Sequence, residues 1–314
     1  MKLRLGTRRS SLGLAQSRWV AERLARAAGA EVELVPIVTR GDTIPGDLGA
    51  AGGKGLFTAE LEAELLDGSL DLAVHSLKDL PVELPAGLVL AAFPERADPR
   101  DALISAAATT LDTLPPGAVL LTGSLRRRAQ ILALRSDLEV RPVRGNVDTR
   151  LAKRRRLEED EGRPGGAILA VAGLDRLGVT GEPVHPIDPA LLLPAPGQGT
   201  LGIEVRSGSP AEELCRALDH PPTARAAAAE RGVVAAFGGD CTLPLAAWAR
   251  EQPGDGGGQS RLRLTALLAS PDGGRIARGE GVAGSAAEAA AECVAAMRAS
   301  AADEILKAIR EGEP

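Results

Sequence analysis

The sequence predicts an α/β protein in which two doubly wound domains are followed by a smaller α+β domain. Three observations support this prediction. The chain has 314 residues, which exceeds the size at which a single hydrophobic core keeps growing. Strand-like apolar runs alternate with helix-like runs in two successive sets. The last third of the chain has a different pattern, in which a strand and a hairpin precede a helix.

The first set is assigned to domain 1, which comprises residues 1–95 together with 195–212. Its elements are a strand over 3–7, a serine-capped helix ending at Gly29, a strand over 30–39, a glycine-rich loop over 41–55, a helix over 56–68, and strands over 70–76 and 87–93. The apolar run 191–205 is interrupted by two prolines. We expect this run to be extended and to return the chain to domain 1.

The second set is assigned to domain 2, residues 96–194, and it follows a crossover over 94–103. Its elements are a strand over 118–123, a helix over 124–135, a strand over 138–144, a helix over 146–160 and a buried strand over 166–173. Domain 3 is assigned to residues 213–314. Its elements are a helix over 223–238, a strand over 245–251, a hairpin over 261–282 and one C-terminal helix over about 286–311.

The composition excludes several classes of protein. No apolar signal segment opens the chain and no run reaches the length of a membrane span, so a cytoplasmic protein with no membrane partner is expected. Three cysteines do not make a disulfide framework. Aromatic residues make up only 2%, which leaves almost nothing for nucleic-acid bases to stack on. No nucleic-acid partner and no metal site are expected.

Charge is unevenly distributed along the chain. Between Arg126 and Arg156, eleven basic residues accompany three acidic ones, so this stretch carries +8 within a chain whose net charge is −5. A basic island in an acidic chain indicates a specific anion site.

Three helix starts carry the basic residues that could form this site. Arg8 and Ser10 open the first helix, Ser124 with Arg126 and Arg127 opens a second, and Arg144 and Arg150 flank the start of a third. Free backbone N–H groups and guanidinium groups at one helix start favour a carboxylate or a phosphate. The competing interpretation is solvated surface charge, which fits Arg154–Arg156 better than these arginines.

The segment HSLKDLP, residues 75–81, follows a predicted strand. Ligands of open α/β sheets bind at the carboxyl ends of strands. Lys78 is therefore a candidate for holding an anion, and Asp79 for handling a proton or a developing positive charge. The competing interpretation is a solvated loop with a helix cap.

Cys241 lies in the turn GGDCTLPLA, residues 238–246. From its spacing alone, the better interpretation is a small apolar residue at a tight corner, because Asp240 opposes ionisation of the thiol. Cys215 and Cys293 lie in helical patterns and are expected to be buried or half-buried.

Several of these segments together resemble the porphobilinogen deaminase family. They are GTRRSSLGLAQ, GGKGLFTAELE, DLAVHSLKDLP, DPRDAL, GSLRRRAQ, RGNVDTRL, ILAVAGLDRLG and PGQGTLGIE. The resemblance covers nearly the whole chain. It implies a transferase of haem and other tetrapyrrole biosynthesis that condenses four porphobilinogen molecules head to tail, with loss of ammonia, and releases hydroxymethylbilane. The two α/β domains would then resemble the halves of periplasmic binding proteins around a cleft.

The resemblance also implies roles for individual residues. Cys241 would carry a dipyrromethane cofactor through a thioether, and Asp79 would be the catalytic carboxylate that stabilises the cationic azafulvene formed when ammonia leaves. The implied cofactor contacts are Lys78, Asp79, Ser124, Arg126, Arg127 and Arg144. The implied substrate contacts are Arg8, Ser10, Arg144, Arg150 and Arg176. Two departures from the family's pattern are Asp240, where the cysteine turn commonly has glycine, and Gly123, where a hydroxyl residue is common.

Two other functions remain as alternatives. One is a protein that binds or senses a carboxylated solute without chemistry, and the other is a cysteine-dependent acyl transferase. The absence of a signal peptide and the presence of a third domain with a cysteine argue against the first. No histidine visibly pairs with Cys241, which argues against the second. A monomer is expected.

Overall fold

The computed structural model describes residues 2–43, 55–56, 58–159, 161–238, 243–253 and 260–312. The chain divides into two compact units, which are described separately. Unit 1 comprises Met1–Ala97 and Thr200–Ala224, and unit 2 comprises Asp98–Gly199 and Arg225–Pro314. Within the described residues, no helix is long and apolar enough to span a membrane.

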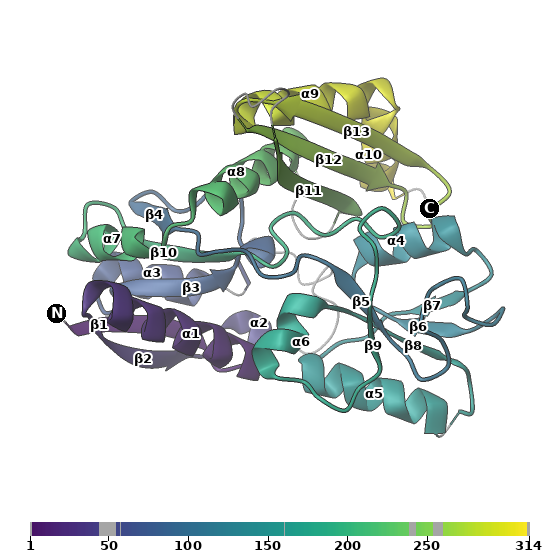
Figure 1. The fold of residues 1–314 in the computed structure, drawn as a ribbon, viewed down its shortest axis with the longest axis horizontal. Helices are drawn as coiled ribbons and strands as arrows, with labels where there is room; N and C mark the ends of the chain where they lie inside the picture. Colours follow the sequence, from purple (N-terminus) through teal and green to yellow (C-terminus); the bar gives the residue numbers. More distant parts are fainter. Residues whose placement is uncertain are drawn as a thin grey trace. The chain divides into compact units, whose positions relative to one another are not determined.

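Unit 1 contains one five-stranded sheet with helices on both faces (Figure 1). Its elements are β1 (Lys2–Arg8), α1 (Ser11–Ala28), β2 (Glu31–Ile37), α2 (Arg40–Thr43), α3 (Ala59–Asp67), β3 (Leu72–Ser76), the 3₁₀ turn η1 (Leu77–Asp79), β4 (Leu88–Ala92), β10 (Leu201–Arg206), α7 (Pro210–Cys215) and the 3₁₀ turn η2 (Arg216–Leu218). The strand order is β2-β1-β3-β10-β4. Strand β1 runs parallel to β2 and β3, whereas β10 runs antiparallel to β3 and β4.

Two hydrophobic cores hold this sheet between its helices. On one face Leu5, Leu72 and Ile203 pack with Val20 and Leu24 of α1. On the other face Leu61 and Leu65 of α3 join a separate cluster with Leu70, Ala73 and Leu88. Because side chains alternate along a strand, the same short strands can supply both cores.

Unit 2 contains a second five-stranded sheet, with the order β7-β6-β8-β5-β9. Its elements are β5 (Asp101–Ile104), β6 (Val119–Leu121), α4 (Leu125–Leu134), β7 (Glu139–Arg141), α5 (Val147–Glu159), β8 (Gly165–Ala170), α6 (Val171–Leu177) and β9 (Val184–Pro186). Strand β6 runs parallel to β7 and β8, and β5 runs antiparallel to β8 and β9. Each five-stranded sheet is therefore mixed.

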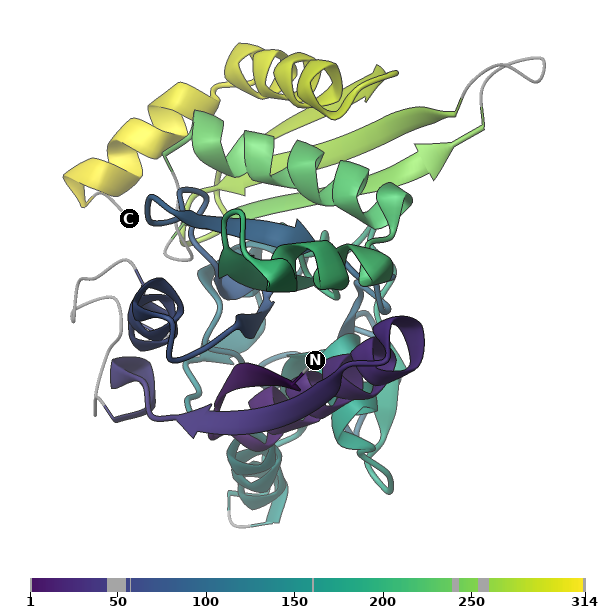
Figure 2. The same ribbon diagram turned by 90° about the vertical axis from the view of Figure 1, so that its left-hand side faces the viewer.

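The C-terminal part of unit 2 is a three-stranded antiparallel sheet covered by helices (Figures 1 and 2). Its elements are α8 (Pro221–Ala236), which begins in unit 1, β11 (Leu245–Gln252), β12 (Arg261–Ala269), β13 (Ile276–Ala283), α9 (Ala286–Ala299) and α10 (Ala302–Glu311). Phe237, Met297 and Ile305 are buried in the core between this sheet and the helices. The opposite face of the sheet places Leu267 against Ala129 of α4.

The predicted class, with α/β sheets followed by an α+β module, is confirmed. The three sheets fall within the three ranges assigned to domains. Several local predictions were wrong or incomplete. Strand β5 begins inside the predicted crossover, and α6 begins where the strand over 166–173 was expected to continue. Strand β9 and helix α7 were not predicted, and the C-terminal helix is two helices. The break occurs at Ala301, whose φ of 67° is left-handed and cannot continue a right-handed helix.

Candidate active site

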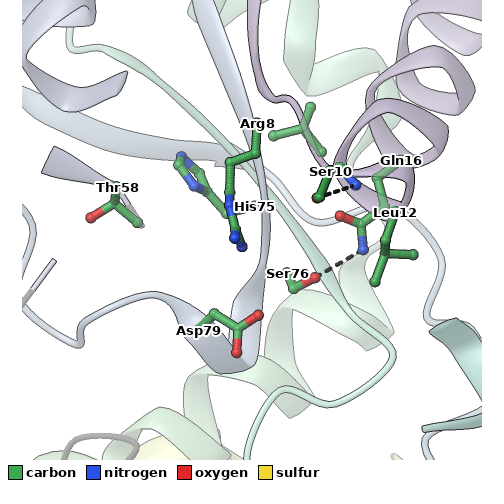
Figure 3. Close-up of a pocket in the computed structure, with 10 residues that line it drawn as sticks. Arg8, Ser10, Leu12, Gln16, Thr58, His75, Ser76 and Asp79 are labelled. Carbon is green, nitrogen blue, oxygen red and sulfur yellow. Dashed lines mark hydrogen bonds between the residues drawn. The ribbon is translucent and has the colours of Figure 1, made fainter. Parts of the chain in front are cut away.

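A small hollow of about 60 Å³ opens in unit 1 where β1 and β3 end. Because these strands are parallel neighbours, their carboxyl ends meet at the same sheet edge. Figure 3 shows Arg8, His75, Ser76 and Asp79 around this space. A cavity of about 10–15 Å³ in this measure already admits one water molecule, so the hollow is large enough for a group the size of a carboxylate.

Helix α1 begins directly at this hollow. Ser10 caps the helix, and its Oγ accepts a hydrogen bond from the backbone N–H of Gly13 at 3.1 Å. Arg8, the last residue of β1, is half-buried and lines the hollow. Gln16, one turn further along α1, donates a hydrogen bond from Nε2 to Oγ of Ser76 at 2.8 Å. The helix start and the end of β3 are thereby held together.

The predicted catalytic segment follows β3 as a single 3₁₀ turn. Leu77 is buried and anchors the turn, Lys78 is half-buried, and Asp79 is exposed at the rim of the hollow. In Figure 3 the Arg8 side chain extends towards the Asp79 carboxylate. The structure therefore brings Arg8, Ser10 and Asp79, which sequence reasoning selected separately, to one place.

Unit 2 places the arginines of the α4 start differently from expectation. Arg126 and Arg127 are buried, and both bind the fully buried Asp101 of β5. Arg126 also donates to the Leu193 carbonyl at 2.6 Å, and Arg127 to the Ile168 carbonyl at 2.8 Å. Burial opposes ionisation of Asp101, but the two arginine charges and the hydrogen bonds from Arg127 and Gln198 hold its pKa far below the ordinary range.

The other predicted residues of unit 2 lie at or near its surface. Ser124 caps α4 by accepting from the Arg127 N–H at 3.4 Å. Arg144 is exposed and Arg150 is half-buried at the start of α5, where Nε of Arg150 donates to the Gly145 carbonyl at 2.8 Å. Arg176 on α6 donates to the Gly199 carbonyl at 2.7 Å. Burial lowers the pKa of Arg176 to about 10, with Asp175 opposing, so the side chain is still a cation at neutral pH.

The structure describes two of the three cysteines. Cys241 and Asp240 lie outside the described residues. Cys215 and Cys293 are buried, as predicted. Burial raises the pKa of each of these two thiols to about 12, which makes both unreactive near neutral pH.

Sequence reasoning missed three buried polar residues beside these sites. Asp101 lies in the quoted segment DPRDAL, but a charged residue there gives no sign of a strand. Gln198 in PGQG was interpreted as part of a turn, yet its Nε2 donates to Asp101 at 2.8 Å. Glu204 in GTLGIE is fully buried, with Oε2 lying 2.9 Å from Nε2 of His75. A single acid within an otherwise apolar strand was the available signal for Glu204.

Comparisons with solved structures give distant similarity. The methionine-binding protein MetQ is 14% identical, with 68% of this chain and 88% of MetQ covered and a TM-score of 0.40. A periplasmic substrate-binding protein of an ABC transporter from Coxiella burnetii is 15% identical, with 71% of this chain and 94% of that protein covered and a TM-score of 0.38.

Comparisons with protein families match this chain to a single family. Residues 3–213 match the model described as porphobilinogen deaminase, dipyromethane cofactor binding domain. Residues 224–303 match the model of the porphobilinogen deaminase C-terminal domain. The chain is 47% identical over 279 residues to the porphobilinogen deaminase of Thermus thermophilus, with 88% of each sequence covered. The chain therefore belongs to the porphobilinogen deaminase family.

Proposed function

We propose that Asp79 and the surrounding basic residues carry out the reaction of this enzyme. The enzyme joins four porphobilinogen molecules head to tail, releases ammonia at each addition and yields hydroxymethylbilane. The residue roles below rest on the geometry of the hollow and on the chemistry of the substrate.

Asp79 is assigned the catalytic role because its carboxylate is exposed at the rim of the hollow. Loss of ammonia leaves positive charge on the pyrrole ring of the substrate. A fixed carboxylate beside the pyrrole N–H interacts more strongly as that charge develops, and only such an interaction accelerates the step. Asp79 is also placed to assist a proton transfer.

The substrate carries an acetate and a propionate, so binding requires several donors. In unit 1, the Arg8 guanidinium and the Ser10 hydroxyl border the hollow that is large enough for one carboxylate. In unit 2, Arg144, Arg150 and Arg176 are assigned to carboxylates of the substrate and the growing chain. Arg is favoured for this role because its planar fork can bind a carboxylate through two hydrogen bonds.

The dipyrromethane cofactor carries the same carboxylates and two pyrrole N–H groups. The proposed contacts fit it chemically, with cations for the carboxylates and one carboxylate for the N–H groups. They are Lys78, Asp79, Ser124, Arg126, Arg127 and Arg144. When bound, the cofactor supplies the primer to which the first substrate unit is joined. We assign its covalent thioether attachment to Cys241, since Cys215 and Cys293 are buried with raised pKa values.

The remaining proposals concern the whole protein. The three sheets support a division into three domains, 1–95 with 195–212, 96–194 and 213–314. We propose a cytoplasmic monomer that acts on a small molecule, without nucleic acid or membrane, and the low aromatic content supports the absence of a nucleic-acid partner. Sedimentation of the purified protein across a concentration series tests the monomer, which requires a mass near 32.3 kDa throughout.

The meeting of Arg8, Ser10 and Asp79 at one hollow carries this proposal. The decisive experiment is an intact mass of the purified protein and of three cysteine variants. Wild type, Cys215→Ala and Cys293→Ala should each carry extra mass matching two linked pyrroles, and Cys241→Ser should carry none and lack activity. A pyrrole-free wild type that only binds porphobilinogen would indicate a solute-binding protein instead.

A further inference from the structure

Three side chains that can ionise are buried together beneath α3, and the roles assigned above use none of them. His75 comes from β3, Glu204 from β10 and Glu62 from α3. Their exposed fractions are 6%, 0% and 9%. Buried groups of this kind are costly unless they are paired, so their presence calls for an explanation.

The register of the sheet brings His75 and Glu204 together. In the antiparallel pair β3–β10, His75 lies opposite Gly202 and Ala73 lies opposite Glu204. His75 and Glu204 are therefore diagonal neighbours on the same face of the sheet. Gly202 has no side chain to separate them, and Nε2 of His75 lies 2.9 Å from Oε2 of Glu204.

His75 and Glu204 are in close contact but do not form a directed hydrogen bond. Nε2 of His75 and both carboxylate oxygens of Glu204 have no hydrogen-bond partner among the described residues, and neither have Oε1 of Glu62 and Oγ1 of Thr58. Burial raises the pKa of Glu62 and Glu204 raises it further, while Thr58 and His75 oppose the shift. Two buried carboxylates therefore lie beside one imidazole, which is the only side chain of this cluster that can become a cation.

His75 also connects this buried cluster to the active site. Its ring borders the same hollow as Arg8 and Asp79 (Figure 3). A neutral ring with its hydrogen on Nε2, the nitrogen that lies 2.9 Å from the Glu204 carboxylate, would leave Nδ1 as the acceptor. A carboxylate that orients an imidazole and stabilises its cation is the arrangement of a general base.

We propose that His75 accepts the proton lost from the terminal pyrrole each time a porphobilinogen unit is joined, and that Glu204 is its positioning residue. The new bond joins the free α-carbon of that pyrrole to the methylene carbon of the incoming unit. The α-carbon–hydrogen bond breaks, its electron pair returns to the ring, and the proton passes to Nδ1 of His75. The imidazolium then gives the proton to the released ammonia, which leaves as ammonium.

This inference rests on the proposed role of Asp79 in one respect. Asp79 is assigned the positive charge that develops on the pyrrole, and His75 is assigned the proton that leaves the α-carbon. Imidazole is the side chain most often used as a general base, and such a base contributes about 10²–10⁴-fold to a rate.

The kinetic test uses porphobilinogen that carries deuterium at its free α-carbon. The deuterium of each added unit is lost when the next unit is joined to it, so the first loss occurs at the second addition. Each elongation from the second onwards is followed by mass in single-turnover experiments. His75→Gln should slow these additions by about 100-fold and raise their deuterium isotope effect above that of wild type. His185→Gln, a change of a histidine in β9 of unit 2, should match wild type. An unchanged isotope effect in His75→Gln would overturn the proposal.

A second measurement does not depend on activity. The chain has three histidines, so the NMR signals of the imidazole nitrogens can be assigned by substituting one histidine at a time. His75 should carry its hydrogen on Nε2 in wild type and in Glu204→Gln, whose amide oxygen still accepts it. Glu204→Gln should nevertheless elongate more slowly, because the charge that stabilises the imidazolium is gone, and Glu204→Asp should recover part of the rate. A hydrogen on Nδ1 in wild type, or normal elongation by Glu204→Gln, would contradict the assignment.

The two proposed roles fail separately in these experiments. Asp79→Ala should slow the release of ammonia without raising the isotope effect. If Asp79→Ala releases ammonia normally while His75→Gln shows the raised isotope effect, the role of Asp79 is wrong and that of His75 stands.

Discussion

Arg127 donates two hydrogen bonds to one oxygen of Asp101, from Nε at 3.0 Å and from Nη2 at 2.7 Å. Arg127 lies in the first turn of α4, where the helix dipole disfavours a cation. Asp101 supplies the compensating charge from β5, and Arg126 binds its other oxygen at 2.8 Å. The two arginines therefore connect helix α4 to strand β5 of the five-stranded sheet in unit 2.

Asp101→Asn should destabilise the protein strongly. The substitution leaves two buried guanidinium groups without their counter-charge, and breaking a buried ion pair in this way costs about 3–5 kcal/mol. The measurement is the free energy of unfolding in urea. Glu22→Gln removes the exposed partner of Arg26 and serves as the control, with an expected change of about 0–1 kcal/mol. Equal effects for the two variants would contradict the ion-pair interpretation.

The contribution of Asp101 to stability should depend on pH in a defined direction. Its pKa is held below the ordinary range in the folded protein, and that of an unfolded aspartate is about 3.9. The contribution is therefore complete above about pH 4 and is lost as the pH falls towards the folded value. The unfolding free energy of wild type minus that of Asp101→Asn should be constant from neutral pH down to this point and then shrink. A difference that already declines between pH 7 and pH 5 would exclude Asp101 as its source.

The sequence predicted the elements whose local signals agree with their tertiary setting. Helix α1 has a serine cap and a terminal glycine, and the β12–β13 hairpin has alternating residues around a turn. Strand β5 was missed because its first residue is Asp101, and buried aspartate is recognisable only once its arginine partners are in place. The break between α9 and α10 is a backbone feature of Ala301, a residue that otherwise favours helix.

In the candidate site, too, the residues that were placed as predicted are those whose local signals agree with their tertiary setting. Arg8 and Ser10 were predicted because basic residues at a helix start favour an anion, and Asp79 was predicted because it follows the end of a strand. Arg126 and Arg127 also lie at a helix start, yet their guanidinium groups turn inwards to an acid 25 and 26 residues earlier. The partnership of His75 and Glu204 depends on the register of β3 against β10, which no local pattern contains.

Arg144→Leu and Arg126→Leu should fail in different ways. Arg144 is exposed, so its loss should leave the unfolding free energy within about 0.5 kcal/mol of wild type while impairing cofactor assembly or elongation. Arg126 is buried against Asp101, so its loss should cost about 3–5 kcal/mol in addition to any effect on the cofactor. Urea unfolding and intact mass distinguish the two outcomes.

Arg128→Leu is the matched control for these arginines, because Arg128 is adjacent in sequence but exposed. It should change neither stability nor cofactor content. Arg155→Leu should also keep activity, although it removes an ion pair with Glu182. Equal loss of elongation in Arg144→Leu and Arg128→Leu would indicate that the basic stretch acts as a general positive field.

Gly123→Ser should destabilise the protein even though a hydroxyl residue is common at this position of the family. A Cβ atom on Gly123 would lie 2.6 Å from the Val143 carbonyl oxygen, so the backbone beside α4 must shift. The expected cost is about 1–3 kcal/mol. Gly284→Ser, at an exposed glycine with no atom near its Cβ position, should be nearly neutral in the same urea experiment. A neutral Gly123→Ser would show that the backbone moves at little cost.

Asp79→Ala should fold, retain the covalent cofactor and bind porphobilinogen, yet release ammonia very slowly. Asp79 is exposed at the end of a turn that Leu77 anchors, so its removal disturbs no buried contact. The interaction it loses is the one that strengthens as positive charge develops on the pyrrole, and this affects the rate more than the binding. Asp79→Glu keeps the charge but displaces it by one methylene, so it should retain part of the activity and accumulate partly elongated enzyme. Single-turnover experiments with mass detection of each elongation state measure both variants. If Asp79→Ala elongates at the wild-type rate, the carboxylate has no catalytic role, and the charge on the pyrrole must be stabilised by another group at the hollow.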